Sequence, residues 1–360
     1  MTAQAADTQR PARPGFATIE AGRGLAALAV VLFHASSSIF PAAKYWNTQV
    51  FGRVFDFGYA GVYFFFVLSG FIIAHVHAGD LGHSDRLARY VQRRFVRIYP
   101  VYWVILAGLL ALLALPFGLS ATQGVEPGVL LSSILLAGPD NLATVVAVAW
   151  TLYHEILFYA AFGLWIVDRR LGAAVTAVWL AGIVAGLVTA LPVPVYVVSP
   201  LNLLFGFGIA AWWVSRRSPI PAAAPIAVAA VAVFIGLGLE AVHLGSLAAP
   251  VREQAFGLAC AVGLATIVSV ERHRRLAVPR ILLILGAASY SIYLTHFPLL
   301  SMFAKIAAKT GVIGRIPAEL AFVVVVMLTV AAGYGFHRLV ERPLLGRLGR
   351  SLRPAKAIVA

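Results

Sequence analysis

Charged side chains are scarce in this sequence, and acidic ones are the scarcest. Only 12% of the residues are charged, whereas a soluble domain carries about 25%. Hydrophobic residues make up 61% of the chain, more than a water-soluble fold of this size can hide in one core. The composition therefore excludes an ordinary soluble enzyme and indicates a protein that has lipid as its solvent.

Cysteine is almost missing as well, since the chain contains only Cys260, which lies inside an apolar run. A single thiol excludes an intrachain disulfide framework and a cysteine metal site, and we interpret it as a small buried apolar residue. We expect no bound metal or cofactor. The polar segment from Met1 to Gly15 lacks the ordered features of a cleaved signal peptide, so the first span would serve as an uncleaved signal-anchor.

The apolar residues are gathered in runs of roughly 17–25 residues, the length that crosses a bilayer core as a helix. The sequence therefore predicts an all-α, polytopic membrane helix bundle of about ten transmembrane helices. The segment 129–137 is apolar but too short to span, and we expect a re-entrant or interfacial piece there. The predicted spans are 17–38, 57–77, 99–118, 145–167, 171–190, 195–214, 221–240, 254–270, 281–304 and 319–338.

Basic residues outnumber acidic ones, 28 to 14. Most of them fall in alternate loops, which by the positive-inside rule places both termini in the cytoplasm. No nucleic-acid-binding motif accompanies the charge, so we expect no nucleic acid partner. We predict a multi-pass protein of the inner (plasma) membrane. Its expected parts are a flexible cytoplasmic N-terminus (1–16), one transmembrane domain (17–345) and a basic cytoplasmic tail (346–360).

Charged groups within a span are costly unless they are paired or face water, so they mark candidate sites. The first span carries Glu20, Arg23 and His34. Arg23 and His34 are about three helical turns apart and share one face, with Glu20 near the same stripe. Arg23 could instead reach the lipid headgroups, and His34 could be a structural core histidine. A histidine deep in a span needs a partner and can exchange a proton near neutral pH.

Two later spans also carry polar stripes. In the fourth span, Thr151, Glu155 and Tyr159 share a face at helical spacing, beside Trp150 and His154. Glu155 could orient a histidine, take a proton, or make a structural hydrogen bond between helices. In the ninth span, the residues that share a face are Ser289, Tyr293 and His296, which could equally be polar contacts between helices.

Arginines stand at helical spacing just before the third span. Arg93, Arg94 and Arg97 adjoin it directly. They could be ordinary cytoplasmic anchors, or they could hold phosphate, which guanidinium groups bind in a bidentate manner. The residues alone thus leave open a transferase or a transporter with an intramembrane polar site and a basic cytoplasmic mouth.

Several motifs in order resemble the membrane-bound acyltransferase family 3, the bacterial exopolysaccharide and lipopolysaccharide O-acetyltransferases, and especially its ExoZ-like members. They are the Arg23–His34 spacing, GVYFFFVLSGF, RRFVRIYP, WTLYHEILFY, SYSIYLTH and the tail motif VERPLL. The resemblance covers nearly the whole chain. One departure is Tyr63, which stands where the family commonly has an acidic residue, so the role of that acid must be absent, moved or replaced.

The resemblance implies an enzyme that transfers acyl groups other than amino-acyl groups, with acyl-CoA, expected to be acetyl-CoA, as co-substrate. His34 would be the catalytic histidine and Arg23 its essential partner, while Arg93, Arg94 and Arg97 would bind the cytoplasmic acyl-CoA. Glu155 would orient or charge the site. The acceptor would be a hydroxyl of a cell-surface or lipid-linked polysaccharide. Further support would come from Glu20, Trp150, Tyr159, Ser289, Tyr293 and His296.

Two other functions remain compatible with intramembrane charges. A polysaccharide or lipid transporter or flippase would work without acyl transfer, and it would be expected to show sequence symmetry between its halves, which we do not find. A scaffold subunit of an envelope complex would need no chemistry at all.

Overall fold

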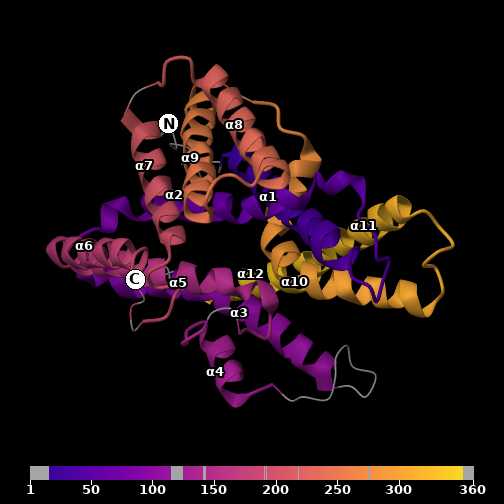
Figure 1. The fold of residues 1–360 in the computed structure, drawn as a ribbon. Coiled ribbons are helices and arrows are strands. Elements are labelled where there is room, and N and C mark those ends of the chain that lie inside the picture. Colours follow the sequence, from indigo (N-terminus) through magenta and orange to yellow (C-terminus); the bar gives the residue numbers. More distant parts are fainter. Residues whose placement is uncertain are drawn as a thin grey trace, which may run out of the picture.

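The computed structural model describes residues 16–114, 125–140, 143–189, 191, 193–217, 219–274 and 276–351, and this part of the chain is helical, with no strand (Figure 1). The α-helices are α1 (Ala17–His34), α2 (Gly61–His77), α3 (Leu87–Ala114), α4 (Pro127–Leu135), α5 (Trp150–Val167), α6 (Arg169–Gly186), α7 (Leu203–Arg217), α8 (Ala223–His243), α9 (Ala249–His273), α10 (Arg280–Lys309), α11 (Ala318–Phe336) and α12 (Arg342–Ser351). The predicted terminal segments fall largely outside these ranges, at residues 1–15 and 352–360.

The all-α membrane bundle predicted from the sequence is confirmed. Within the described ranges, nine helices are long and apolar enough to cross a membrane. The predicted span at 195–214 differs, because α7 begins only at Leu203 and has 15 residues. Pro194 lies before it in non-helical chain, and Pro200 opens a single 3-10 turn. Proline supplies no backbone donor and disfavours helix in the residue before it, which explains the late start.

The helix predicted at 99–118 also has a different beginning. α3 starts at Leu87 and runs through Pro100 without a break in the helix, while residues 115–118 lie outside the described part. The basic segment and the membrane span are therefore one continuous helix. As a result, the arginines of this segment are held on a regular helix rather than on a loop.

The short apolar segment at 129–137 forms α4, which has nine residues and is too short to cross a bilayer. Side chains of neighbouring helices bind its C-terminal carbonyl groups. Tyr102 donates a hydrogen bond of 2.7 Å to the carbonyl of Ser133, and Tyr153 donates one of 2.8 Å to that of Ser132. These bonds satisfy helix-end carbonyls that would otherwise lack partners and fix α4 against α3 and α5.

Two helix pairs pack closely because glycine removes the side chain between them. A Cβ atom on Gly208 of α7 would lie 1.8 Å from the carbonyl oxygen of Val67 in α2. A Cβ atom on Gly286 of α10 would lie 1.9 Å from the carbonyl oxygen of Glu20 in α1. The close pairing of α1 with α10 brings together two of the helices that carry polar stripes. In Figure 1, α7, α8 and α9 lie on one side of α2, and α3 and α4 lie on the other.

Candidate active site

A cavity of about 1090 Å³ runs between α1, α2, α3, α5, α7, α9 and α10. It slightly exceeds the roughly 300–1,000 Å³ that is usual for small-molecule sites. Arg93, Arg216 and Arg272 line it and are exposed, so the cavity opens to the outside at their end. The residues predicted for the site that line this cavity are Glu20, Arg23, Arg93, Arg94, Arg97, Glu155, Tyr159, Ser289 and Tyr293.

Arg97 is held in place by a buried carboxylate that was not among the site residues predicted from the sequence. Its Nη1 atom lies 3.3 Å from Oε1 of Glu341, whose side chain is only 2% exposed. Ser291 donates a hydrogen bond of 2.6 Å to the other oxygen of Glu341, and His337 lies 2.9 Å from the same atom. The Arg97 guanidinium also lies over the Tyr290 ring. A buried carboxylate needs such partners, and together they position Arg97 at the cavity wall.

Arg94 and Arg23 differ in how they are satisfied. Arg23 forms an ion pair of 3.1 Å with Glu20, one turn earlier on α1, and both line the cavity. Arg94 lies over the Tyr159 ring, and its buried Nε atom has no hydrogen-bond partner in the described part of the protein. A buried unpaired donor is costly, so Arg94 has hydrogen-bonding capacity left for a ligand in the cavity.

Glu155 sits in the wall of the cavity, one turn before Tyr159 on α5. Tyr159 donates a short hydrogen bond to Oε1 of Glu155, and Ser69 of α2 donates one of 3.0 Å to the same oxygen. The contacts recorded for Glu155 are therefore hydroxyl groups rather than a histidine. Thr151 and Tyr159 also line the cavity, which confirms that the polar stripe of α5 faces one space.

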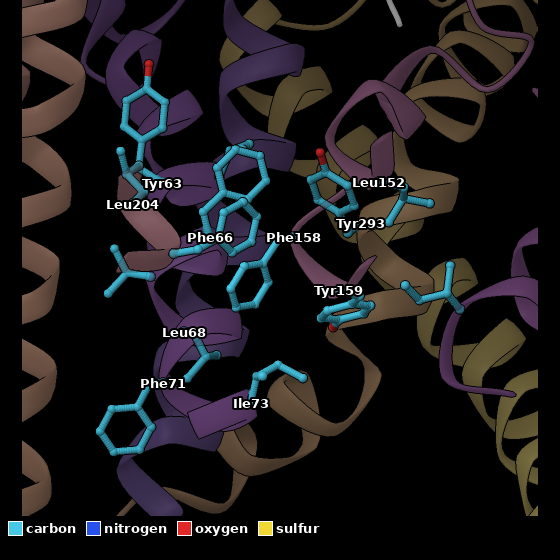
Figure 2. Packing of buried hydrophobic residues seen from close by; sticks show 14 of the residues in the cluster. Tyr63, Phe66, Leu68, Phe71, Ile73, Leu152, Phe158, Tyr159, Leu204 and Tyr293 are labelled. Carbon is cyan, nitrogen blue, oxygen red and sulfur yellow. The ribbon is translucent and has the colours of Figure 1, made fainter. Parts of the chain in front are cut away.

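Tyr293 and Thr151 lie deep in the cavity lining. Their hydroxyl groups are 3.1 Å apart, and both reach the carbonyl oxygen of Val148. The hydroxyl of Ser289, one turn away on α10, is buried and has no hydrogen-bond partner in the described ranges. Figure 2 shows Tyr293 and Tyr159 in the same region of the buried cluster. This end of the cavity thus combines phenols, hydroxyls and the Glu155 carboxylate.

His34 and His296 do not line the cavity but form a pair beside it. The Nε2 atom of His296 lies 3.1 Å from Nδ1 of His34, and Nδ1 of His296 lies 2.6 Å from the carbonyl oxygen of Tyr293. His34 ends α1, where a π-helical turn (Ala35–Ile39) follows. Such turns are rare and often occur at functional sites. Tyr293 therefore lies between the cavity and the histidine pair. Its side chain lines the cavity, and its carbonyl oxygen binds His296.

Trp150 also lies outside the cavity lining. Its ring contacts those of Phe66 and His154, and His154 is bound to Asn202 at 2.9 Å. Tyr63, at the position where the related family commonly has an acid, packs its ring on Tyr59 and Phe256. Figure 2 shows Tyr63 apart from Tyr159 and Tyr293. Neither Trp150 nor Tyr63 contributes to the cavity surface.

Ser69, Arg216 and Arg272 also line the cavity, and Glu341 lies behind its wall, although none of the four was predicted as a site residue from the sequence. Arg216 and Arg272 carried no signal beyond positive charge near a loop, since they lie in the last turns of α7 and α9 and are far apart in sequence. Glu341 did carry a signal, because it belongs to the VERPLL segment and is an acidic residue in a chain with few acids.

Comparison with known proteins adds to this geometry. Residues 16–338 match the family described as Acyltransferase domain. The exopolysaccharide production protein ExoZ of Rhizobium meliloti (strain 1021) is 31% identical over 319 residues, which cover 84% of this chain and 94% of that protein. The acyltransferase MdmB of Streptomyces mycarofaciens is 35% identical over 149 residues, 40% of this chain and 37% of that protein.

A further relative is protein 2 in the picA locus of Rhizobium radiobacter, which is 29% identical over 168 residues, 42% of this chain and 82% of that protein. No solved structure matches the chain. The family match covers nearly all of the membrane bundle and the whole cavity lining. This chain is therefore a multi-pass membrane protein that belongs to acyltransferase family 3, and it is an acyl-transferring enzyme.

Proposed function

We propose that this enzyme takes an acetyl group from acetyl-CoA on the cytoplasmic side of the inner membrane and transfers it to a hydroxyl of a cell-surface or lipid-linked polysaccharide. The observation that carries the proposal is the cavity, which joins an arginine-rich opening to a deep polar end at Glu155, Thr151 and Tyr293. The similarity to a protein named for exopolysaccharide production supports a glycan acceptor.

The opening suits the charged part of an acyl-CoA. Arg93, Arg94 and Arg97 stand on one continuous helix and line the cavity. Guanidinium groups bind phosphate oxygens in a bidentate manner, and the free Nε of Arg94 adds an unused donor. The apolar lining beyond them, from α2 and α5, would receive the pantetheine arm, so that the thioester points toward the deep polar end.

His34 would act as the general base for the acceptor hydroxyl. The carbonyl oxygen of Tyr293 can only accept, so the nearby Nδ1 of His296 carries the proton and its Nε2 accepts. Nδ1 of His34 faces that Nε2 atom and, at 3.0 Å, the carbonyl oxygen of Val30. Both neighbours are acceptors, so His34 carries its proton on Nδ1. Its Nε2 is then left with a lone pair for a substrate proton.

The transfer step would proceed as follows. The acceptor oxygen bonds to the thioester carbonyl carbon while its proton passes to Nε2 of His34. The carbon–sulfur bond then breaks, and the leaving CoA thiolate takes the proton from Nε2 of His34, which restores the base. Because Tyr293 lies between the cavity and the histidine pair, the acyl group must reach past its side chain. Arg23 lies about three turns from His34 on α1 and pairs with Glu20, so it would bind the phosphate linked to the pantetheine arm rather than the reacting thioester.

The test uses membranes from cells that produce the glycan, supplied with radiolabelled acetyl-CoA. Wild type should place label in polysaccharide, and His34→Ala should lower the rate about 100-fold or more, since general base catalysis is worth about that much. His83→Ala, an exposed histidine between α2 and α3, is the matched control and should keep full activity. Equal labelling by wild type and His34→Ala would contradict the role of His34. No labelling by wild type would contradict the donor or the acceptor.

A further inference from the structure

A second group of arginines lines the opening of the cavity, apart from the group on α3. Arg216 is in the last turn of α7, Arg272 is in the last turn of α9, and both are exposed lining residues. α7 and α9 pack on each other and on α2, whereas α3 packs on α5 and α10. The opening is therefore flanked by guanidinium groups from two separate parts of the bundle.

Arg216 and Arg272 differ from Arg23 and Arg97 in their partners. Arg23 and Arg97 form ion pairs with Glu20 and Glu341. For Arg216 and Arg272 the structure records no carboxylate partner among the residues that it describes, and the two repel each other electrostatically. Like charges that are close together and lack a counter-ion are unfavourable, and a bound anion would relieve this repulsion.

Both guanidinium groups are held in position by their surroundings. Arg272 donates a short hydrogen bond from Nη1 to the carbonyl oxygen of Ser215 and lies over the ring of Phe16. Arg216 lies over the ring of Trp212 at 4.7 Å. Phe16 and Trp212 both line the cavity, but Trp212 is buried, so the accessible apolar surface beside the two cations is that of Phe16. Such a combination suits a phosphate attached to a nucleoside, because the base can stack while the arginines bind the phosphate.

We propose that Arg216 and Arg272 form a specificity subsite for the 3′-phosphate of the CoA donor, with the adenine ring against Phe16. The α3 arginines then hold the diphosphate at the other flank of the opening. This inference rests on the proposed function, since it takes CoA thioester as the donor. Phosphate chemistry alone would also fit a lipid headgroup at the same two arginines, and the experiment separates the two sources.

The experiment measures binding of CoA and of dephospho-CoA, which lacks the 3′-phosphate, by calorimetry on the full chain in phosphatidylcholine nanodiscs. Wild type should bind CoA about tenfold more tightly than dephospho-CoA, because a charge-assisted contact is worth about this factor. The double variant Arg216→Ala/Arg272→Ala should lose this preference and should bind dephospho-CoA as wild type does, which also shows that it is folded. Arg217→Ala, on the same helix but outside the cavity lining, should keep the preference.

Four results would overturn the inference in distinguishable ways. Equal weakening of both ligands in the double variant would mean that the arginines supply only general positive potential. An unchanged preference in the double variant would assign them to another phosphate, such as a lipid headgroup. Equal binding of the two ligands by wild type would remove the 3′-phosphate subsite while leaving the CoA donor intact. Binding of neither ligand by wild type would remove the proposed donor itself.

Discussion

The Nε2 atom of His296 lies 3.1 Å from Nδ1 of His34, which ties the middle of α10 to the end of α1. His296 is fully buried, while His34 is partly accessible. His296 is therefore suited to orient His34, and His34 is suited to contact a substrate.

Replacing His296 should slow the reaction without weakening donor binding. His296→Ala removes the acceptor that fixes the proton of His34, and we expect kcat to fall about tenfold or more, the value of one such hydrogen bond. His296→Gln keeps an oxygen acceptor and should recover part of the rate. The measurement is kcat and KM for acetyl-CoA. A change in KM alone, or equal loss in both variants, would contradict the orienting role.

Replacing Glu155 should affect chemistry at the deep end of the cavity. Glu155→Gln keeps the shape and still accepts from Tyr159 and Ser69, but it removes the negative charge. We expect kcat to fall about tenfold or more, because charge at a reacting centre has effects of this size. The readout is the acetyl content of the surface glycan by mass spectrometry. Glu319→Gln, an exposed acid at the start of α11, is the control and should leave acetylation unchanged.

Replacing Glu341 should destabilise the bundle and weaken donor binding together. Glu341→Ala leaves Arg97 without its ion-pair partner, and breaking a buried pair costs about 3 kcal/mol or more. Because Arg97 is partly exposed and water screens it, the loss should lie at the lower end of that range. Thermal unfolding in detergent measures the stability, and KM for acetyl-CoA reports on Arg97. An unchanged KM in folded Glu341→Ala would show that Arg97 does not need this positioning.

Two glycines on α7 provide a matched test of helix packing. Gly208→Ala would place a methyl group 1.8 Å from the Val67 carbonyl oxygen, so α2 and α7 must separate, and the unfolding temperature should fall. Gly206→Ala meets nothing within 4 Å and should be neutral or stabilising by up to about 1 kcal/mol, the helix preference for alanine. The same temperature shift in both variants would contradict the close contact.

Much of the fold was predictable because lipid imposes a simple rule on the chain. An apolar run of sufficient length must be a helix when no water is present to satisfy its backbone, so most spans could be located from hydrophobicity alone. Hydrophobicity alone misplaces helix ends where prolines interrupt an apolar run or where a helix continues into a polar segment. It placed a full span at 195–214, although the helix begins at Leu203, and it started α3 at residue 99 although the helix begins at Leu87.

The sequence by itself determined that the chain lies in a membrane, that its polar residues fall on a few helices, and that Thr151, Glu155 and Tyr159 share one face, because helical periodicity is a local property. Only the tertiary structure decided which stripes meet. It brought Arg97 to Glu341 and His34 to His296, and it added Arg216 and Arg272 to the cavity. These contacts join residues far apart in the chain, and they depend on helix packing, which no local pattern encodes.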